Sequence, residues 1–137
     1  MPKIYLYTTF YKEQNNLRKQ ELLSCFQNNL SNKAISKIIV FNEGESIAYL
    51  EPTKIEEVFI DKRPTYQDFI NYINTNSSPD DIHIITNTDI YFDKNIEVLK
   101  LINLNNTCFA LSRWDTTESR KPKLYKYNDS QDVWIFK

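Results

Sequence analysis

One stretch decides the fold: Ile82-His83-Ile84-Ile85-Thr86-Asn87-Thr88-Asp89-Ile90-Tyr91-Phe92-Asp93, an apolar run that stops at an amide and two carboxylates. A short run rich in isoleucine predicts a buried central strand. The end of that strand delivers Asn87 and Asp89 to the sheet edge where open α/β folds bind ligands. Residues two positions apart in an extended chain project to the same side. Asn87 and Asp89 therefore suit two-point capture of a divalent cation or a ribose.

The carboxylates of this stretch also have structural interpretations. Asp89 could cap a turn, and Asp93 could cap the helix that follows. For Asp93 we favour the cap, because Ile96, Leu99 and Ile102 follow it at helical spacing. For Asp89 we favour the ligand, because nothing downstream needs it as a cap.

Length and composition indicate a single domain over residues 1–137. The chain has 137 residues, 41% of them hydrophobic, which suffices for one core. A formal net charge of -1 gives no general attraction to nucleic acid, so we expect no nucleic-acid partner. No apolar run approaches the roughly 20 residues of a membrane span, and Met1-Pro2-Lys3 leads directly into a strand pattern instead of a signal peptide. We therefore expect a soluble, cytoplasmic protein.

Two scarce residue types narrow the chemistry. Gly44 is the only glycine, which excludes a P-loop and a GxGxxG dinucleotide turn. A bound phosphate would then have to be neutralised by a metal ion and basic side chains. His83 is the only histidine, which excludes a Ser-His-Asp triad, a Cys-His pair and any multi-histidine metal site. Since it lies inside the predicted strand, we interpret His83 as a core residue with its hydrogen bonds satisfied.

Hydrophobic periodicity predicts alternating strands and helices. Strands are expected over residues 3–9, 38–41 and 57–60, in the run from Ile82, over 107–111, and in a last strand-like run within 130–137. Helices are expected around 22–30, after the Thr65/Asp68 capping box, and over 94–103. This order predicts an α/β fold with a mostly parallel sheet and helices on both faces. Residues 116–130 lack an apolar period and are expected to form a mobile loop near the mouth of the site.

Polar residues follow the carboxyl ends of these strands, so we expect them to converge on one cleft. The set suits a nucleoside diphosphate, with Mg²⁺ or Mn²⁺ held by a carboxylate and Arg63 as a bidentate phosphate partner. A surface salt bridge from Arg63 to Asp61 or Asp68 is an alternative of equal weight. The converging residues are Thr8, Thr9, Phe10, Asn42, Glu43, Asp61, Arg63, Asn87 and Asp89.

Four stretches together carry a family resemblance. They are Asn87-Thr88-Asp89-Ile90-Tyr91-Phe92-Asp93, Arg63-Pro64-Thr65-Tyr66, Ser112-Arg113-Trp114-Asp115 and Ser130-Gln131-Asp132-Val133-Trp134-Ile135-Phe136. In these stretches the chain resembles glycosyltransferases of the GT-A type, especially small viral and bacterial members. The resemblance implies a GT-A-like α/β domain that binds a nucleotide-diphosphate sugar.

The resemblance also implies roles for single residues. Asn87-Thr88-Asp89 occupies the place of the family's DxD motif, so Thr88 would lie within the nucleotide-binding motif. Asp89 would match the carboxylate that binds Mn²⁺ or Mg²⁺, while Asn87 replaces the first Asp and would keep only the hydrogen bond to the ribose. Nucleotide contacts would further come from Thr8 and Thr9 in the loop beside it, and from Asp61 and Arg63 at the base and diphosphate.

The chain departs from the family in length. GT-A domains usually run further, so we expect a domain shortened at its C-terminus, without part of the acceptor site. Asp132 is the late carboxylate in a structured-looking motif, and we take it as the candidate base that deprotonates an acceptor hydroxyl. With equal weight, Asp132 could cap or bond the backbone of the last element. Arg113 and Asp115 could contact the sugar at the rim.

Two functions from different classes follow. The first is a metal-dependent glycosyltransferase that moves sugar from a nucleotide-diphosphate sugar donor to a carbohydrate or other hydroxyl acceptor. The second is a shortened or degenerate domain that binds nucleotide, sugar or a protein partner without efficient catalysis. The length and Asn87 favour the second, and the retained carboxylates favour the first. Trp134 and Phe136 near the end could also draw two copies into a homo-oligomer.

Overall fold

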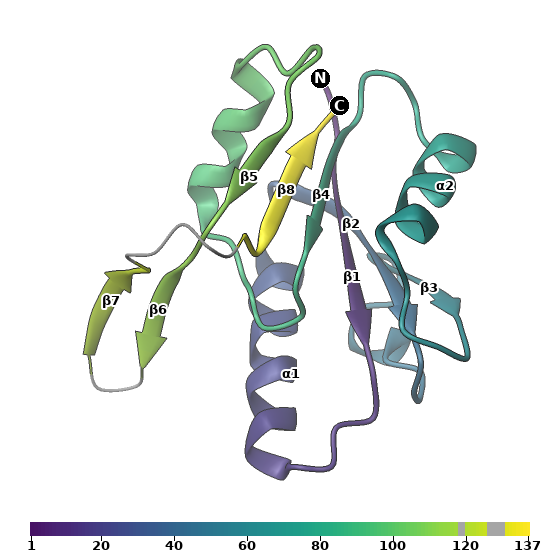
Figure 1. Ribbon diagram of the computed structural model, residues 1–137, viewed down its shortest axis with the longest axis vertical. Coiled ribbons are helices and arrows are strands. Elements are labelled where there is room, and N and C mark those ends of the chain that lie inside the picture. Colours follow the sequence, from purple (N-terminus) through teal and green to yellow (C-terminus); the bar gives the residue numbers. More distant parts are fainter. Residues whose placement is uncertain (118–119, 126–130) are drawn as a thin grey trace.

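A twisted sheet forms the centre of the computed structural model, which describes residues 1–117, 120–125 and 131–137 (Figure 1). Its strand order is β3-β2-β1-β4-β8-β5, and β8 runs antiparallel to both of its neighbours, while β1 to β4 are parallel. The predicted α/β class with a mostly parallel sheet is therefore confirmed. The strands are β1 (Ile4–Phe10), β2 (Ile35–Asn42), β3 (Ile55–Phe59), β4 (Ile82–Thr86), β5 (Phe109–Leu111) and β8 (Val133–Phe136).

Helices cover both faces of the sheet, as predicted (Figure 1). The α-helix α1 (Asn16–Ser31) and the 3-10 helix η2 (Lys94–Leu101) pack on one face, and the α-helix α2 (Tyr66–Asn76) packs on the other. The capping box that begins α2 is present. A short 3-10 helix, η1 (Ala48–Leu50), interrupts the predicted loop after β2. None of the helices in the described ranges combines the length and apolar character that crossing a bilayer requires.

The helix expected over 94–103 is present as η2, which is a 3-10 helix and ends two residues earlier, at Leu101. Its two buried residues, Ile96 and Leu99, are three positions apart, and the three-residue turn of a 3-10 helix keeps such a pair on one face. Asp93 does cap it, since its carboxylate accepts from the backbone N–H of Asn95 at 2.9 Å.

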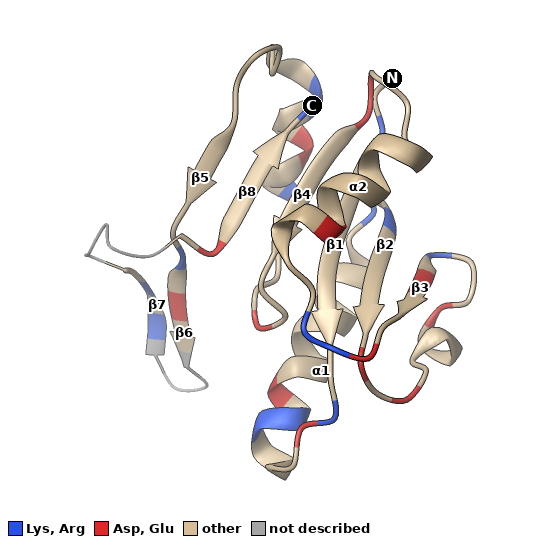
Figure 2. Ribbon diagram, turned by 45° about the vertical axis from the view of Figure 1, so that its right-hand side comes forward, with Lys and Arg blue, Asp and Glu red and all other residues tan. Residues whose placement is uncertain are grey.

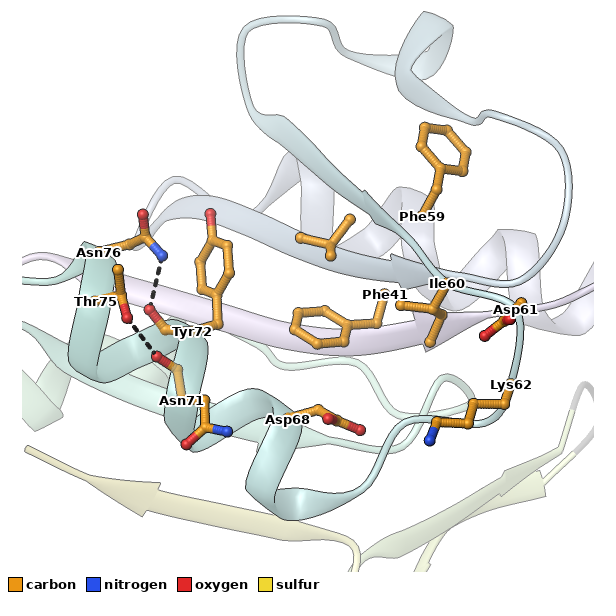
Figure 3. A pocket seen from close by; sticks show the side chains of 11 residues that line it. Phe41, Phe59, Ile60, Asp61, Lys62, Asp68, Asn71, Tyr72, Thr75 and Asn76 are labelled. Carbon is orange, nitrogen blue, oxygen red and sulfur yellow. Dashed lines mark hydrogen bonds between the residues drawn. The ribbon is translucent and has the colours of Figure 1, made fainter.

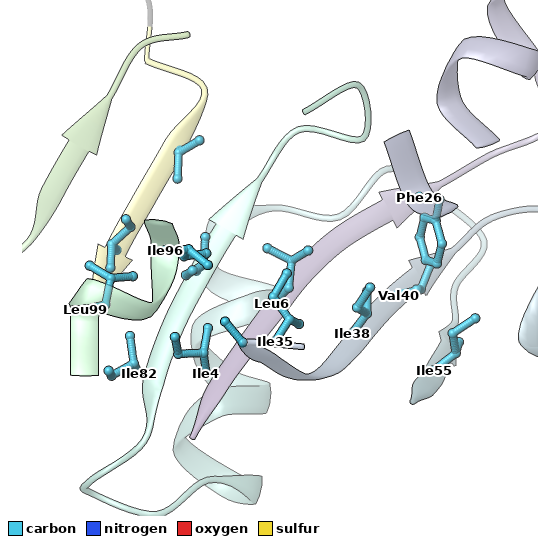
Figure 4. Close-up of a cluster of buried hydrophobic side chains, with 14 of the residues drawn as sticks. Ile4, Leu6, Phe26, Ile35, Ile38, Val40, Ile55, Ile82, Ile96 and Leu99 are labelled. Atoms are coloured by element: carbon cyan, nitrogen blue, oxygen red, sulfur yellow. The ribbon is translucent and has the colours of Figure 1, made fainter. Parts of the chain in front are cut away.

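Alternating side chains of the central strands divide between two cores. Leu6 and Ile84 lie in the core under α1 and η2, part of which Figure 4 shows. Tyr7 and Ile85 belong to the second core, under α2. His83 is buried, and its Nδ1 is hydrogen-bonded to the Tyr7 hydroxyl at 3.0 Å, which confirms it as a satisfied core residue. All five residues of β4 are buried, as the apolar run predicted.

The loop expected over 116–130 is wrong for its first part, where a two-stranded antiparallel hairpin projects from the sheet (Figure 1). The hairpin comprises β6 (Trp114–Thr117) and β7 (Arg120–Leu124). It buries little, because Trp114 and Leu124 both stay exposed, and so it leaves no apolar period in the sequence. The rest of that predicted loop, residues 118–119 and 126–130, lies outside the described residues.

Candidate functional site

The site lies where the order of strands in the sheet changes direction. From β1 the order proceeds to β2 and β3 on one side and to β4 on the other, so β1 and β4 flank a topological switch point. There Thr9 Oγ1 lies 2.9 Å from Thr88 Oγ1, and the Thr88 hydroxyl donates to the Thr9 carbonyl at 2.8 Å. Two predicted nucleotide-contact residues thus meet at the position where open α/β sheets bind ligands.

Thr8, next to this contact, is also buried. Its hydroxyl oxygen has no hydrogen-bond partner within the described part of the chain. An unpaired hydroxyl in the interior carries a desolvation cost of about 1–3 kcal/mol. The carboxyl end of β1 therefore holds an unused hydrogen-bonding group beside the Thr9–Thr88 contact.

Asn87 and Asp89 do not act as the predicted pair on one side of an extended strand. The backbone N–H of Ile90 donates to the carbonyl of Asn87 at 3.3 Å, which closes a turn just after β4. Because of this turn, the two side chains find different partners. Asn87 donates to Asp132 Oδ1 at 2.9 Å, and Asp89 Oδ2 accepts from Arg18 Nη2 at 3.0 Å.

Arg18 is a site residue that the sequence reasoning missed. It lies in the first turn of α1 and donates to both Glu21, at 2.8 Å, and Asp89. Hydrogen bonds to Glu21, and then to Asp89, raise the pKa of its guanidinium. The side chains of Arg18 and Asp89 are 37% and 35% exposed, so solvent reaches the pair. Its position in the first helical turn after β1 is the signal that could have identified it.

Asp132 lies at the centre of a second network. It is only 5% exposed, and its Oδ2 accepts from Arg113 Nη1 at 3.0 Å while its Oδ1 accepts from Asn87. Arg113 Nε also donates to Asp115 at 2.8 Å, and its guanidinium lies 4.3 Å from the ring centroid of Tyr125. Hydrogen bonds to Asp115, and then to Asp132, raise the pKa of Arg113. The carboxylate of Asp132 thus ties β4, β8 and the start of the hairpin together.

Two predicted contacts at the ends of β1 and β2 have internal partners instead. Phe10 is buried against Phe26, with ring centroids 6.3 Å apart. Asn42 is buried too; it donates to Glu57 Oε2 at 2.7 Å and accepts from the backbone N–H of Gly44 at 2.7 Å. In this structure both side chains serve the fold.

Asp61 and Arg63 lie in the exposed segment between β3 and α2, and within the described chain no hydrogen bond or ion pair joins them to Thr9, Thr88 or Asp89. Asp61 lines a cavity of about 750 Å³ between β3 and α2; Figure 3 shows Asp61 and Lys62 at one end of it and Asn76 at the other. None of the ion pairs among the described residues includes Arg63, so the predicted salt bridge to Asp61 or Asp68 is absent from that part of the chain.

A larger cleft, of about 1190 Å³, opens beside Asp89. One face of α1 and the hairpin line it, together with the turn after β4 and the ends of β5 and β8. Figure 2 shows a basic band followed by an acidic position near the N-terminal end of α1, with further charged positions near the starts of β6 and β8. The cleft lies on the α1 face of the sheet, whereas the cavity at Asp61 lies on the α2 side.

Asp89 could hold a divalent cation only together with other ligands, such as the phosphates of a bound nucleotide. The described residues contain no group of three or more histidine, cysteine or acidic side chains that could hold a metal ion. Mg²⁺ at nucleotide sites is usually bound by one or two carboxylates plus substrate phosphates, so a lone carboxylate is compatible with it. Asp89 is partly exposed, and its Oδ1 accepts no hydrogen bond from the described residues. A cation there would compete with Arg18.

Comparison with known proteins identifies the fold. One similar structure, 4-diphosphocytidyl-2C-methyl-D-erythritol synthase from Anaerococcus prevotii, has a TM-score of 0.52 and 13% identity, covering 98% of this chain and 70% of that one. Another, CMP:2-keto-3-deoxy-manno-octonic acid synthetase complexed with CTP, has a TM-score of 0.51 and 10% identity, covering 98% and 73%. No family model matches the sequence, and the comparison with curated proteins found no match. The chain thus has a nucleotide-sugar-transferase-like fold, as the resemblance implied.

Proposed function

We propose that the protein is a glycosyltransferase domain that takes a nucleotide-diphosphate sugar as its donor. The observation that carries this proposal is the contact between Thr9 and Thr88 at the switch point, with the carboxylate of Asp89 one residue further on. The fold supports it in a general way, since one of the similar structures was solved with CTP.

In this proposal the donor lies across the carboxyl ends of β1 and β4. Thr9 offers its half-buried hydroxyl group to the nucleotide, whereas the buried Thr8 hydroxyl would reach it only if the end of β1 opened. The segment with Asp61 and Arg63 binds the base and the diphosphate from the β3 side. Arg63 is exposed and has no ion-pair partner within the described chain, so it is free to pair bidentately with phosphate.

Asp89 would hold the divalent cation, Mn²⁺ or Mg²⁺. When bound, such a cation supplies charge neutralisation for the leaving nucleoside diphosphate. Arg18 keeps the Asp89 carboxylate compensated in the meantime, because its guanidinium lies 3.0 Å away. If the metal ion displaced Arg18 from Asp89, the Arg18 guanidinium would be a second positive charge beside the diphosphate.

Asp132 is the proposed base for the acceptor hydroxyl. In the transfer step the acceptor oxygen forms a bond to the anomeric carbon, the bond from that carbon to the diphosphate breaks, and the acceptor proton passes to the Asp132 carboxylate. Both oxygens of that carboxylate already accept hydrogen bonds, from Asn87 and Arg113. Proton transfer therefore requires that one of the two contacts opens.

The two hydrogen bonds on the Asp132 carboxylate favour a second candidate function, in which the domain binds nucleotide or sugar without efficient turnover. A buried carboxylate held on both oxygens is suited to fixing the ends of β4 and β8. If Asp132 only does this, the domain lacks a base but keeps its donor site.

Release of nucleoside diphosphate from a panel of nucleotide sugars, with and without acceptor saccharides, tests the proposal. The wild-type chain should release diphosphate in Mn²⁺ or Mg²⁺, and Asp89→Asn should lose most of that activity. Asp80→Asn is the matched control, since the Asp80 side chain is 87% exposed and precedes β4, whereas Asp89 follows the other end of that strand. No release from any donor, with nucleotide binding intact, would leave the second function.

A further inference from the structure

The lining of the cleft of about 1190 Å³ shares Asp89 with the proposed donor site, and the role of its other residues is unassigned. The cleft exceeds the 300–1,000 Å³ that is roughly typical of small-molecule pockets. Its two walls are α1 and the hairpin formed by β6 and β7, which stand beside each other below the sheet in Figure 1. The other residues that we place in the donor site lie outside its lining, with Asp89 at the boundary.

The wall on α1 is a stripe of hydrogen-bonding side chains. Gln20, Ser24 and Asn28 follow one another at four-residue spacing, so they share one face of the helix, and all three line the cleft. Their side chains are exposed and have no hydrogen-bond partner among the described residues, in contrast to the paired Arg18 and Asn29. The stripe therefore presents free amide and hydroxyl groups to whatever occupies the cleft.

Two aromatic rings complete the lining. Trp114, at the base of the hairpin, is 62% exposed, and Tyr91, in the segment after β4, is 44% exposed. Flat aromatic faces beside amide and hydroxyl groups match the surface of a sugar ring, which carries apolar C–H faces and a rim of hydroxyl groups. An aromatic side chain with one polar end contacts such an amphipathic partner well.

The charges of the lining select against anions. Glu21, Asp89 and Asp93 face the cleft, while Arg113 is the basic residue of its described lining. Arg113 is already paired with Asp115 and Asp132. Arg18 pairs in the same way with Glu21 and Asp89 at the edge of the cleft, which leaves Asp93 as the lining carboxylate without a basic partner among the described residues. The described lining therefore offers no free cation to a phosphate or a carboxylate on a ligand.

We infer that this cleft binds an uncharged saccharide, stacked on Trp114 and hydrogen-bonded by the polar stripe of α1. In naming the saccharide as the acceptor, the inference rests on the proposed function, since the cleft adjoins Asp89. Binding of the saccharide itself needs neither nucleotide nor metal ion.

An array of neutral and anionic oligosaccharides, printed at equal density and probed with the whole chain in the presence of a chelator, tests this inference. The chain should retain neutral saccharides and reject uronate-containing ones of equal length. Trp114→Ala should lower retention at least tenfold, and Asn28→Ala should lower it by a smaller factor. Tyr49→Ala is the control, because Tyr49 is also a largely exposed aromatic residue, at 72% against 62% for Trp114, and lies outside the cleft. Raising the salt to about 0.5 M should weaken the rejection of anions.

Three outcomes would overturn the inference: no saccharide retained by the wild-type chain, better retention of anionic than neutral saccharides, or equal losses in Trp114→Ala and Tyr49→Ala. Nucleotide affinity, measured on the same proteins, separates this inference from the proposed function and checks that Trp114→Ala is folded. If saccharide is retained but nucleotide is not bound, the saccharide-binding inference is supported and the proposed function fails. If nucleotide is bound but no saccharide is retained, the cleft inference fails alone.

Discussion

Asn87, which directly follows β4, and Asp132, which directly precedes β8, are joined by two hydrogen bonds. The Asn87 side-chain amide donates to Asp132 Oδ1 at 2.9 Å, and the Asn87 backbone N–H donates to the Asp132 carbonyl at 3.2 Å. The end of β4 is thereby fastened to the start of β8. The side-chain contact requires an amide at position 87, because an ionised aspartate could not donate to Asp132.

The Asn87–Asp132 contact predicts an order of stabilities. Asn87→Ala should lower the free energy of unfolding by about 1–3 kcal/mol, because it leaves a buried carboxylate oxygen unpaired. Asn87→Asp should be more destabilising at pH 7, since it sets two carboxylates against each other. Urea unfolding at pH 7 measures the three stabilities, and Asn87→Asp matching the wild type would refute the interpretation.

The two arginine pairs of the site should differ in their contributions to stability. Arg113→Ala should cost about 2–3 kcal/mol, because it removes a hydrogen bond to a charged partner that is only 5% exposed. Arg18→Ala should cost less than about 1 kcal/mol, since Asp89 stays solvated without it. Chemical unfolding of both variants gives the comparison. Equal losses would mean that solvent reaches Asp132 as easily as Asp89.

Burial of His83 predicts a pH dependence of stability. Desolvation lowers the pKa of this imidazole in the folded protein, while the negative charge of Asp81 acts in the opposite direction. The unfolded chain, with a histidine pKa of about 6.5, then binds more protons than the folded chain, so stability falls as the pH drops through 6.5. Unfolding free energies between pH 8 and pH 5.5 should show this slope, and His83→Gln should flatten it. An unchanged slope would assign it to other groups.

Substitutions of Arg63 test whether this residue binds the donor or is only a surface charge. Arg63→Ala should weaken nucleoside diphosphate binding by about 1.5–3 kcal/mol, the scale of a hydrogen bond to a charged group. Arg63→Lys should recover only part of this, because an ammonium group cannot pair bidentately. Titration calorimetry with uridine diphosphate provides the affinities. Identical affinity in both variants and the wild type would place Arg63 outside the site.

Much of the sheet was predictable because its strands are short runs with strong periodicity. The apolar run from Ile82 gives β4, the Thr65 and Asp68 pair gives the start of α2, and Asp93 gives the cap of η2. These signals are local: each depends on residues within one turn or one strand.

The remaining features depend on contacts across long sequence separations. Arg18 meets Asp89 across 71 positions and Asn87 meets Asp132 across 45, and neither pair leaves a local pattern. The insertion of β8 between β4 and β5 is likewise a matter of tertiary pairing. The hairpin was missed because Trp114 and Leu124 point an apolar surface at solvent instead of a core. The prediction that Asn87 and Asp89 project to the same side was wrong because the chain turns between Asn87 and Ile90 instead of staying extended.

The central claim is that Asp89 binds a divalent cation together with a nucleoside diphosphate. Its most direct test is calorimetric titration of uridine diphosphate into the wild-type chain and Asp89→Asn, each in Mn²⁺ and in chelator. The account predicts at least tenfold tighter binding to the wild type in Mn²⁺ than in chelator, and no such difference for Asp89→Asn. Equal binding of the nucleotide by the wild-type chain in Mn²⁺ and in chelator would contradict it.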